Sequence, residues 1–397
     1  MYNAFDDAVK DRLNGLEQAG TYKRYRNLAS PMAAYAAMAG QRDVVVMSSN
    51  NYLGLANHPR VVKAAQEALE KYGAGTASVR FICGSMDIHE TLEAELARLH
   101  GTEAALTFSS CWAANTGLIP SICGEGDVII SDTLNHASII DGCRMVGKGV
   151  TKAVYPHADL KALEMVLKEH VGARHRFIVT DGVFSMEGSL APLPAICDLA
   201  DKYQATLIVD DSHGVGVMGA TGAGVAEFYH CEARVDIYTG TLGKALGGAA
   251  GGYVAGRKHV IELLKQNART NLFSNAISPA TAGAALGALQ VMRDEPQLLQ
   301  ALHENVGYFR HQLQEAGFKP LPGESAIVPI IIGDTAKAIA VADALFKRGV
   351  FITGFGHPVV PEGTARLRAQ VSAAHSKSDL DSVVRELLFV RQELKSF

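Results

Sequence analysis

Lys244 stands alone as a charged residue in a glycine-rich stretch. It is the only charged side chain between Asp236 and Arg257, and glycines flank it on both sides. Most lysines are solvated among other polar residues, and this stretch fits that pattern poorly. Desolvation in an apolar, backbone-rich pocket favours the neutral amine, which can attack a carbonyl to form a Schiff base. Lys244 is therefore predicted to be the covalent attachment point of an aldehyde cofactor.

Asp210 ends the apolar run 207–209, and His213 follows three residues later. On its own, a carboxylate at this place is expected to cap the next loop, and a lone histidine is more often structural. Beside a Schiff-base lysine, a fixed anion can keep a pyridine nitrogen protonated, so that the ring withdraws electrons. Pyridoxal phosphate (PLP) needs such a partner. His213 is then expected to hydrogen-bond the phenolic oxygen of the ring.

Two strand-to-helix junctions offer further contacts. The segment 109–117 runs from an apolar strand into a helix, whose first amides lack partners inside the helix and favour an anion. Ser110, Cys111 and Trp112 are predicted to form a phosphate cradle there, and Thr241 to add a hydroxyl. At the second junction, His136 either stacks on the ring or caps the helix that it begins, and the sequence leaves both interpretations open.

A strand at 365–371 carries two arginines on one face. Alternation with a period of two places Arg366, Arg368 and Gln370 on the same side. A strand-held arginine suits bidentate binding of a carboxylate. Basic residues are usually just solvated, and that interpretation stays open for one of the pair.

Short apolar runs alternate with segments of helical length through the middle of the chain. These runs are 104–108, 128–130, 177–179, 207–209, 235–238 and 252–255. The alternation predicts an α/β fold whose mostly parallel sheet is covered on both faces. Polar residues follow the strand ends, where ligands bind in such sheets.

The two ends of the chain have other patterns. Residues 4–19 form an expected amphipathic helix with Phe5, Val9, Leu13 and Leu16 on one side, which must pack on its own body or on a second subunit. A helix is expected to begin at Pro279 and to lead into a small α+β domain. The predicted division is an arm (1–45), a large domain (46–290) and a small domain (291–397).

Composition excludes several classes. Lys+Arg 37 against Asp+Glu 41 gives a net charge of −4 without a basic block, so nucleic acid is not an expected partner. Neither a leader peptide nor a membrane span is expected, which favours a cytoplasmic protein. The 6 cysteines lack metal-ligand spacing, so neither a metal site nor a disulfide framework is predicted.

Five segments, in order along nearly the whole chain, resemble the α-oxoamine synthases, PLP enzymes of fold type I that join an amino acid to an acyl-CoA. They are 50–55 (NNYLGL), 135–142 (NHASIIDG), 180–186 (TDGVFSM), 209–213 (VDDSH) and 240–244 (GTLGK). The segments 77–84 (ASVRFICG) and 358–361 (PVVP) look most like the branch that makes 2-amino-3-oxobutyrate from glycine and acetyl-CoA. The resemblance implies a large domain with a mostly parallel seven-stranded sheet, a small α+β C-terminal domain and a homodimer with shared sites.

The resemblance also implies a role for each matching residue. Lys244 would form the Schiff base and move the α-proton, with Asp210 on the ring nitrogen. His213 and Ser185 would serve the ring oxygen, and His136 would stack on the ring. The remaining roles are phosphate binding by Cys111, Trp112, Thr241 and Ser274 of the partner subunit, and carboxylate binding by Asn50 and Arg368.

Two departures and several alternatives stay open. Trp112-Ala-Ala stands where the glycine-using branch typically has Phe-Asp-Ala, and Gly356-His357 replaces an aromatic residue and a tyrosine. The acyl preference is therefore not fixed. An enzyme that uses a longer acyl-CoA, or alanine or serine, is one alternative, similar to 8-amino-7-oxononanoate synthase or serine palmitoyltransferase. A PLP-dependent threonine aldolase and a non-covalent nucleotide-binding protein are others.

Overall fold

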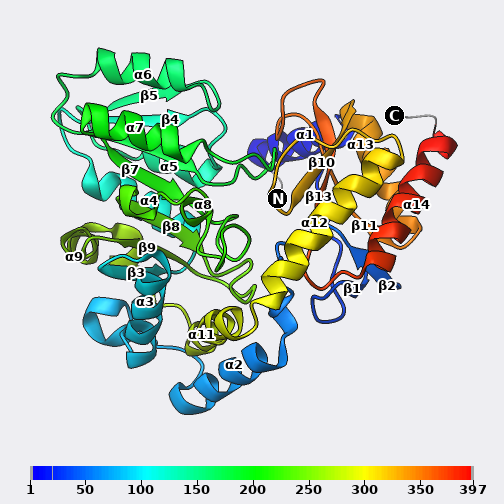
Figure 1. Ribbon diagram of the computed structural model, residues 1–397, viewed down its shortest axis with the longest axis horizontal. Helices are drawn as coiled ribbons and strands as arrows, with labels where there is room; N and C mark the ends of the chain where they lie inside the picture. Colours follow the sequence, from blue (N-terminus) through cyan, green and yellow to red (C-terminus); the bar gives the residue numbers. More distant parts are fainter. Residues whose placement is uncertain (1–2, 20, 395–397) are drawn as a thin grey trace.

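The protein, described by a computed structural model over residues 3–19 and 21–394, is built around a seven-stranded sheet in the order β3-β9-β8-β7-β6-β4-β5 (Figure 1). Its strands are β3 (Ala104–Phe108), β4 (Val128–Asp132), β5 (Thr151–Tyr155), β6 (Arg176–Asp181), β7 (Thr206–Asp210), β8 (Ile237–Thr241) and β9 (Gly252–Gly256). Strands β4 to β8 pair in parallel, whereas β9 is antiparallel to both of its neighbours. The predicted mostly parallel sheet is confirmed. β5 was absent from the expected apolar runs because it is an edge strand with mostly exposed side chains.

Helices cover both faces of this sheet, as expected from strands that are apolar throughout. Alternate strand residues face opposite sides: Ile129 and Ile208 belong to one buried cluster, Ile130 and Val209 to the other. The first cluster contains residues of α4 (Cys111–Ile122), α5 (Ala137–Arg144) and α9 (Lys258–Asn267). The second contains residues of α3 (Asp87–His100), α6 (Leu160–Glu169) and α7 (Leu193–Tyr203).

A second group of elements lies on the right of Figure 1 and carries two small sheets, β10-β13-β12 and β1-β2-β11. Its strands are β1 (Tyr35–Met38), β2 (Gln41–Val46), β10 (Ile327–Gly333), β11 (Val350–Phe351), β12 (Thr353–Phe355) and β13 (Ala365–Gln370). Its helices are α12 (Gln297–Glu315), α13 (Thr335–Lys347) and α14 (Lys377–Leu394). β2 pairs with β11, which joins residues 41–46 to the C-terminal part. The division at residues 45 and 290 stays a prediction, and residues 1–2, 20 and 395–397 lie outside the described part.

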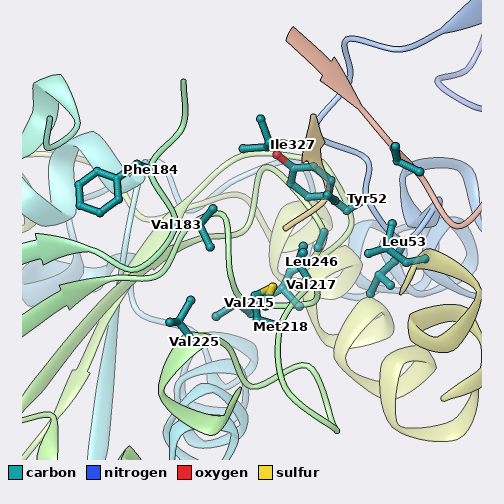
Figure 2. Close-up of a cluster of buried hydrophobic side chains, with 14 of the residues drawn as sticks. Tyr52, Leu53, Val183, Phe184, Val215, Val217, Met218, Val225, Leu246 and Ile327 are labelled. Atoms are coloured by element: carbon teal, nitrogen blue, oxygen red, sulfur yellow. The ribbon is translucent and has the colours of Figure 1, made fainter. Parts of the chain in front are cut away.

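α2 (Pro59–Tyr72) and α11 (Pro279–Asp294) pack together below the sheet in Figure 1. α11 begins as predicted, with the Ser278 side chain accepting a hydrogen bond from the amide of Thr281. A continuous buried cluster joins the two groups of elements, and Figure 2 labels Tyr52, Leu246 and Ile327 among its members. The short helices α8 (Val225–Phe228) and α10 (Arg269–Leu272), 3-10 turns at Leu55–Asn57 and Glu232–Arg234, and a π-helical turn at Arg80–Gly84 complete the described elements.

The predicted N-terminal helix is α1 (Ala4–Gln18). The side chain of Asn3 caps its first turn, and the Asp6 carboxylate accepts a hydrogen bond from the amide of Asn3. None of its residues is buried in this chain, and Phe5 is 73% exposed. The apolar side of α1 is therefore uncovered. Within the described residues, none of the helices combines the length and the apolar character that crossing a membrane requires.

Candidate active site

Three neighbouring strands end in polar residues at one edge of the large sheet. Asp181 ends β6 and lies opposite Asp210, the last residue of β7, which in turn lies opposite Thr239 of β8. Because these strands are parallel, their carboxyl ends meet at the same edge. Burial, and then the Asp210 charge, raise the pKa of Asp181 well above the usual range. Asp181 is thus favoured as the neutral acid beside Asp210.

Lys244 lies in the loop after β8, and part of its surface stays open. Its depth in the molecule lowers its pKa to about 8, although Asp210 and Cys111 act in the opposite direction. Gly247 and Gly248 turn the chain directly after it with φ of 91° and 66°, values that only glycine adopts readily. Glycine backbone therefore flanks this amine as predicted, although the side chain stays partly open. Its lowered pKa makes the amine neutral more often than that of a solvated lysine.

Asp210 is held as a hydrogen-bond acceptor on both oxygens. Its Oδ1 accepts the amide of Ser212 at 3.0 Å, and its Oδ2 accepts Asn115 Nδ2 at 2.6 Å. The Cys111 thiol donates to the same Oδ2 at 3.6 Å. Burial, followed by the Asp210 charge, raises the pKa of Cys111, so the thiol stays protonated. Cys111 therefore lacks the thiolate that nucleophilic chemistry requires.

The N-terminus of α4 fits an anion. Ser110 caps this helix, and its side chain accepts the amide of Ala113 at 3.0 Å. Among the described residues, the amides of Cys111 and Trp112 have no hydrogen-bond acceptor. β9 passes close by at Gly252, where an added Cβ would lie 2.2 Å from the nitrogen of Cys111. Two free amides and the positive end of the helix dipole therefore point out of α4.

His136 caps α5, with Nδ1 accepting the amide of Ser138 at 3.3 Å. Its own amide donates to Asp181 Oδ2 at 2.9 Å. Burial lowers its pKa, Asp210 counters that effect, and Lys244 adds to it. The capping interpretation of His136 is thus confirmed, while stacking on a cofactor ring stays a prediction. The ring of Trp112, which is 45% exposed, meets the His136 ring edge-on at 6.0 Å.

His213 and Asn50 belong to one hydrogen-bond network. Gln370 Nε2 donates to Asn50 Oδ1 at 2.5 Å and to the Tyr52 hydroxyl at 3.0 Å. The Tyr52 hydroxyl in turn lies 2.8 Å from His213 Nδ1. Burial, with Lys244 second, lowers the pKa of His213 well below its usual value. His213 is therefore favoured as a neutral imidazole. Its Nδ1 is engaged by the Tyr52 hydroxyl, which leaves Nε2 to serve the site.

The two arginines of β13 are both buried but have different partners. Arg366 Nη1 lies 3.2 Å from Glu187 Oε1 and also donates to the carbonyl of Met186. Arg368 forms no ion pair among the described residues, and its Nε is buried without a partner. A buried guanidinium with an unsatisfied donor is costly, so Arg368 is the member of the pair that is suited to bind a carboxylate.

Three predicted residues are less closely tied to this group. The Thr241 hydroxyl donates to the carbonyl of Gly251 at 3.2 Å and accepts the amide of Gly243. Ser185 lies in the loop after β6, and Ser274 follows α10. In the described parts of the chain, neither serine makes a hydrogen bond with the other predicted site residues.

Sequence reasoning missed Asn115, Ser138 and Tyr52 and gave Asp181 no role. Asn115 lies one helical turn after Cys111 and therefore faces the same way. Tyr52 lies two residues after Asn50, and Ser138 two after His136. Their positions next to predicted residues were visible, but their partners, far away in the sequence, were not.

This set of groups fits PLP. A neutral-prone amine, an anion at a strand end, two imidazoles and a helix start with free amides match an aldehyde, a pyridine nitrogen and a phosphate. No cluster of His, Cys, Asp and Glu suited to a metal ion occurs among the residues that the structure describes.

Known proteins agree with this assignment. The model of the family "Aminotransferase class I and II" matches residues 42–387. The chain is 46% identical to the 8-amino-7-oxononanoate synthase of Symbiobacterium thermophilum over 98% of this chain and 99% of that protein. It is also 46% identical to the 2-amino-3-ketobutyrate coenzyme A ligase of Escherichia coli over 99% of both.

A solved structure of serine palmitoyltransferase from S. paucimobilis, with a bound PLP–myriocin aldimine, superposes with a TM-score of 0.91 at 26% identity, covering 98% of both chains. That solved structure shares the fold of this chain and holds PLP. The chain therefore belongs to the aminotransferase class I and II family and, within it, to the PLP-dependent α-oxoamine synthases.

Proposed function

We propose that this enzyme condenses glycine with acetyl-CoA to give 2-amino-3-oxobutyrate and CoA. The observation that carries the proposal is the buried Arg368, whose Nε has no partner and whose strand neighbour Arg366 is already paired. The Arg368 guanidinium has a side-chain hydrogen bond with Tyr52 but no carboxylate partner among the described residues. It is therefore suited to bind an anion, and the α-carboxylate of an amino acid supplies one. Asn50, held by Gln370, is the second carboxylate contact.

PLP, when bound, supplies an electron sink that stabilises negative charge on the α-carbon of the amino acid. Lys244 would hold its aldehyde carbon and Asp210 its ring nitrogen. The amides of Cys111 and Trp112, capped by Ser110, would hold its phosphate. The other contacts are those predicted from the sequence: Thr241 and Ser274 of the partner subunit for the phosphate, His213 and Ser185 for the ring oxygen, and His136 for the ring face.

The residues of the chain divide the remaining work. Arg368 binds the carboxylate and thereby orients the α-carbon of glycine. Lys244 Nζ, with a pKa of about 8, is a base matched to neutral pH and takes a proton from that carbon. The carbon then attacks the thioester carbonyl, the C–C bond forms, and CoA leaves as the thiolate. The Asp210 charge raises the pKa of both Lys244 and His136, and Lys244 lowers the pKa of His136. The protonation of each group therefore depends on the charges of the others.

A cavity of about 800 Å³ is the proposed site of the acyl-CoA. Glu17, residues 21–26, part of α13 and the segment 351–359 line it. Lys23, Arg24 and Arg26 line this cavity, where Arg24 pairs with Glu17 and Arg26 with Asp343. Three basic groups against two acidic ones leave a small positive excess, which suits the phosphates of CoA. Phe355 connects it to the substrate arginine, because its ring centroid lies 5.8 Å from Arg368 Cζ. His357 also lines the cavity, so its departure from the usual pattern bears on the acyl group.

A second candidate is a synthase that uses a longer acyl-CoA, or that uses alanine or serine in place of glycine. The chain is 46% identical both to an 8-amino-7-oxononanoate synthase and to a 2-amino-3-ketobutyrate ligase. This equal similarity supports the second candidate as well as the first. A threonine aldolase, which needs no thioester, is the third.

Thiol release, measured for a series of acyl-CoA donors with glycine, alanine or serine, separates these candidates. Fastest release with glycine and acetyl-CoA supports the proposal, and a preference for long donors or for alanine supports the second candidate. Cleavage of free threonine without any thioester supports the aldolase. Lys244→Ala is the control and should release no thiol with any pair.

We also propose a cytoplasmic homodimer, without nucleic-acid or membrane partners. Phe81, Ile82 and Phe273 are 63%, 69% and 66% exposed. They share one surface, because Val79 and Asn275 form a bridge between their two segments. Together with the uncovered side of α1, this apolar surface suits a second copy, which would bring Ser274 of the partner subunit to the site. Sedimentation of a single-chain species at micromolar concentration would argue against the dimer.

A further inference from the structure

Asn115 connects Asp210 to His136 through Ser138. Asn115 is buried on α4, and its Nδ2 lies 2.6 Å from Asp210 Oδ2 and 2.9 Å from the Ser138 hydroxyl. That hydroxyl lies 2.8 Å from His136 Nδ1. Three hydrogen bonds thus form an unbroken chain between the two predicted cofactor contacts, from β7 through α4 and α5.

The chain has only one consistent direction. An amide nitrogen carries two protons and accepts none, so Asn115 donates to both Asp210 and Ser138. The reversed amide would place its oxygen 2.6 Å from a carboxylate oxygen, where two acceptors repel. The amide of Ser138 donates to His136 Nδ1 at 3.3 Å, which makes that nitrogen the acceptor. The Ser138 hydroxyl, which accepts from Asn115, therefore gives its single proton to Nδ1 and does not accept from it.

We propose that Asn115 and Ser138 are positioning residues that hold Asp210 as an anion and His136 as a neutral ring with its proton on Nε2. The inference rests on the proposed function, because it concerns how the site receives PLP. A pyridine ring that Asp210 keeps protonated is cationic, and a cationic imidazole stacked on it would repel it. Asn115 thus acts on both residues. It stabilises the Asp210 carboxylate by donating to it and, through Ser138, disfavours protonation of His136.

The charges around His136 show why such a device is needed. Asp210 on β7 favours protonation of His136, and Asp181 on β6 lies against its amide. Lys244 opposes protonation, and His213 is a further titratable group in the same neighbourhood. The Cys111 thiol on α4 is neutral. The hydroxyl directed at Nδ1 counters the attraction that Asp210 alone would exert.

Trp112 provides a local probe. It is the only tryptophan of the chain, and its ring lies 6.0 Å from the His136 ring at an angle of 80°. A protonated imidazole quenches the emission of an adjacent indole, whereas a neutral one does so far less. The fluorescence of the full-length protein freed of cofactor should therefore fall as His136 takes up a proton. His136→Asn identifies this signal, because it should abolish the acid quench.

The experiment compares the pH midpoint of the quench in the wild type with that in Ser138→Ala, Asn115→Leu and Asn115→Asp. Ser138→Ala removes the hydroxyl that donates to Nδ1, and Asn115→Leu leaves that hydroxyl free to turn away. Each change should raise the midpoint by about 0.5 to 1 pH unit. Asn115→Asp should raise it most, because it adds a negative charge and an acceptor. Ser212→Ala is the matched control: its hydroxyl contacts Cys111 Sγ at 3.3 Å, outside the chain, and the midpoint should stay in place.

Unchanged midpoints in folded Ser138→Ala and Asn115→Leu, with circular dichroism like that of the wild type, would overturn the proposal. The wild type alone gives a second test by nitrogen NMR of labelled histidine, with the His136 signal identified from His136→Asn. A proton found on Nδ1 overturns the inference even if none of the Asn115 and Ser138 variants folds. Both measurements are independent of turnover, so failure of thiol release with every acyl-CoA would refute the proposed function and leave this result standing.

Discussion

Arg366 pairs with Glu187, whereas Arg368, two residues further along the same strand, leaves its Nε unpaired. Arg368→Ala should raise the KM for glycine by about 10- to 100-fold, since a charge-assisted hydrogen bond is lost. The KM for the acyl-CoA should change far less. Stability should hold or rise, because a desolvated cation is removed. Steady-state kinetics with each substrate varied in turn would measure the split.

Arg366→Ala is the matched control for that change. It should lower the free energy of unfolding by about 2–3 kcal/mol, because the nearly buried Glu187 loses its partner and the loop at Met186 loses a donor. Denaturant unfolding of the two variants under the same conditions gives the comparison. A larger KM effect for glycine in Arg366→Ala than in Arg368→Ala would reverse the assignment.

Lys244 should react with PLP at a lower pH than a solvated lysine. Its amine is deep in the molecule, which lowers its pKa from 10.5 to about 8. The reactive neutral fraction should therefore rise through pH 8 and level off about two units before an ordinary lysine does. Borohydride trapping of the cofactor over a pH series, followed by mass measurement of the peptide that contains Lys244, gives the midpoint.

Asp210→Asn tests the source of that value. Asp210 is the largest influence that raises the pKa of Lys244 against burial, so removing its charge should move the trapping midpoint below 8. The same variant should lose most of its turnover, because nothing then holds the ring nitrogen protonated. A midpoint that moves upward, or turnover near that of the wild type, would contradict the role of Asp210.

The sequence was enough to predict the large sheet, because its inner strands are apolar on both faces and end in polar residues. β5 was not predicted, because Tyr155 is its only buried residue and no apolar run marks the strand. The amphipathic pattern also located α1. In contrast, the pairing of β2 with β11 joins residues about 300 apart and leaves no local pattern.

For the site, residue chemistry located the groups but not their partners. Periodicity placed Arg366 and Arg368 on one face, yet only the fold shows which of them meets Glu187. Likewise, Asn115 on α4 is an ordinary helix residue in the sequence, and its contact with Asp210 spans 95 positions. Such hydrogen bonds depend on the relative placement of distant elements, which composition and spacing do not encode.

Asp211 should make the stability of the enzyme depend on pH between about 4 and 7. Its Oδ2 accepts the amide of Val225 at 2.7 Å, but its buried Oδ1 has no partner. Burial, and then Asp210, raise its pKa from 3.8 to about 7. Between these values the folded state binds the extra proton, so the free energy of unfolding should fall as pH rises, by on the order of 4 kcal/mol in total.

Asp211→Asn keeps the acceptor for Val225 and removes the titration. The free energy of unfolding of this variant should therefore depend less on pH over this range than that of the wild type. The variant should be most stabilised relative to the wild type at pH 7 and above. Thermal or denaturant unfolding at pH 4.5, 6 and 7.5 would show the difference in slope. Parallel curves for the two proteins would mean that Asp211 is not the group that titrates, and that its charge is compensated in the folded state.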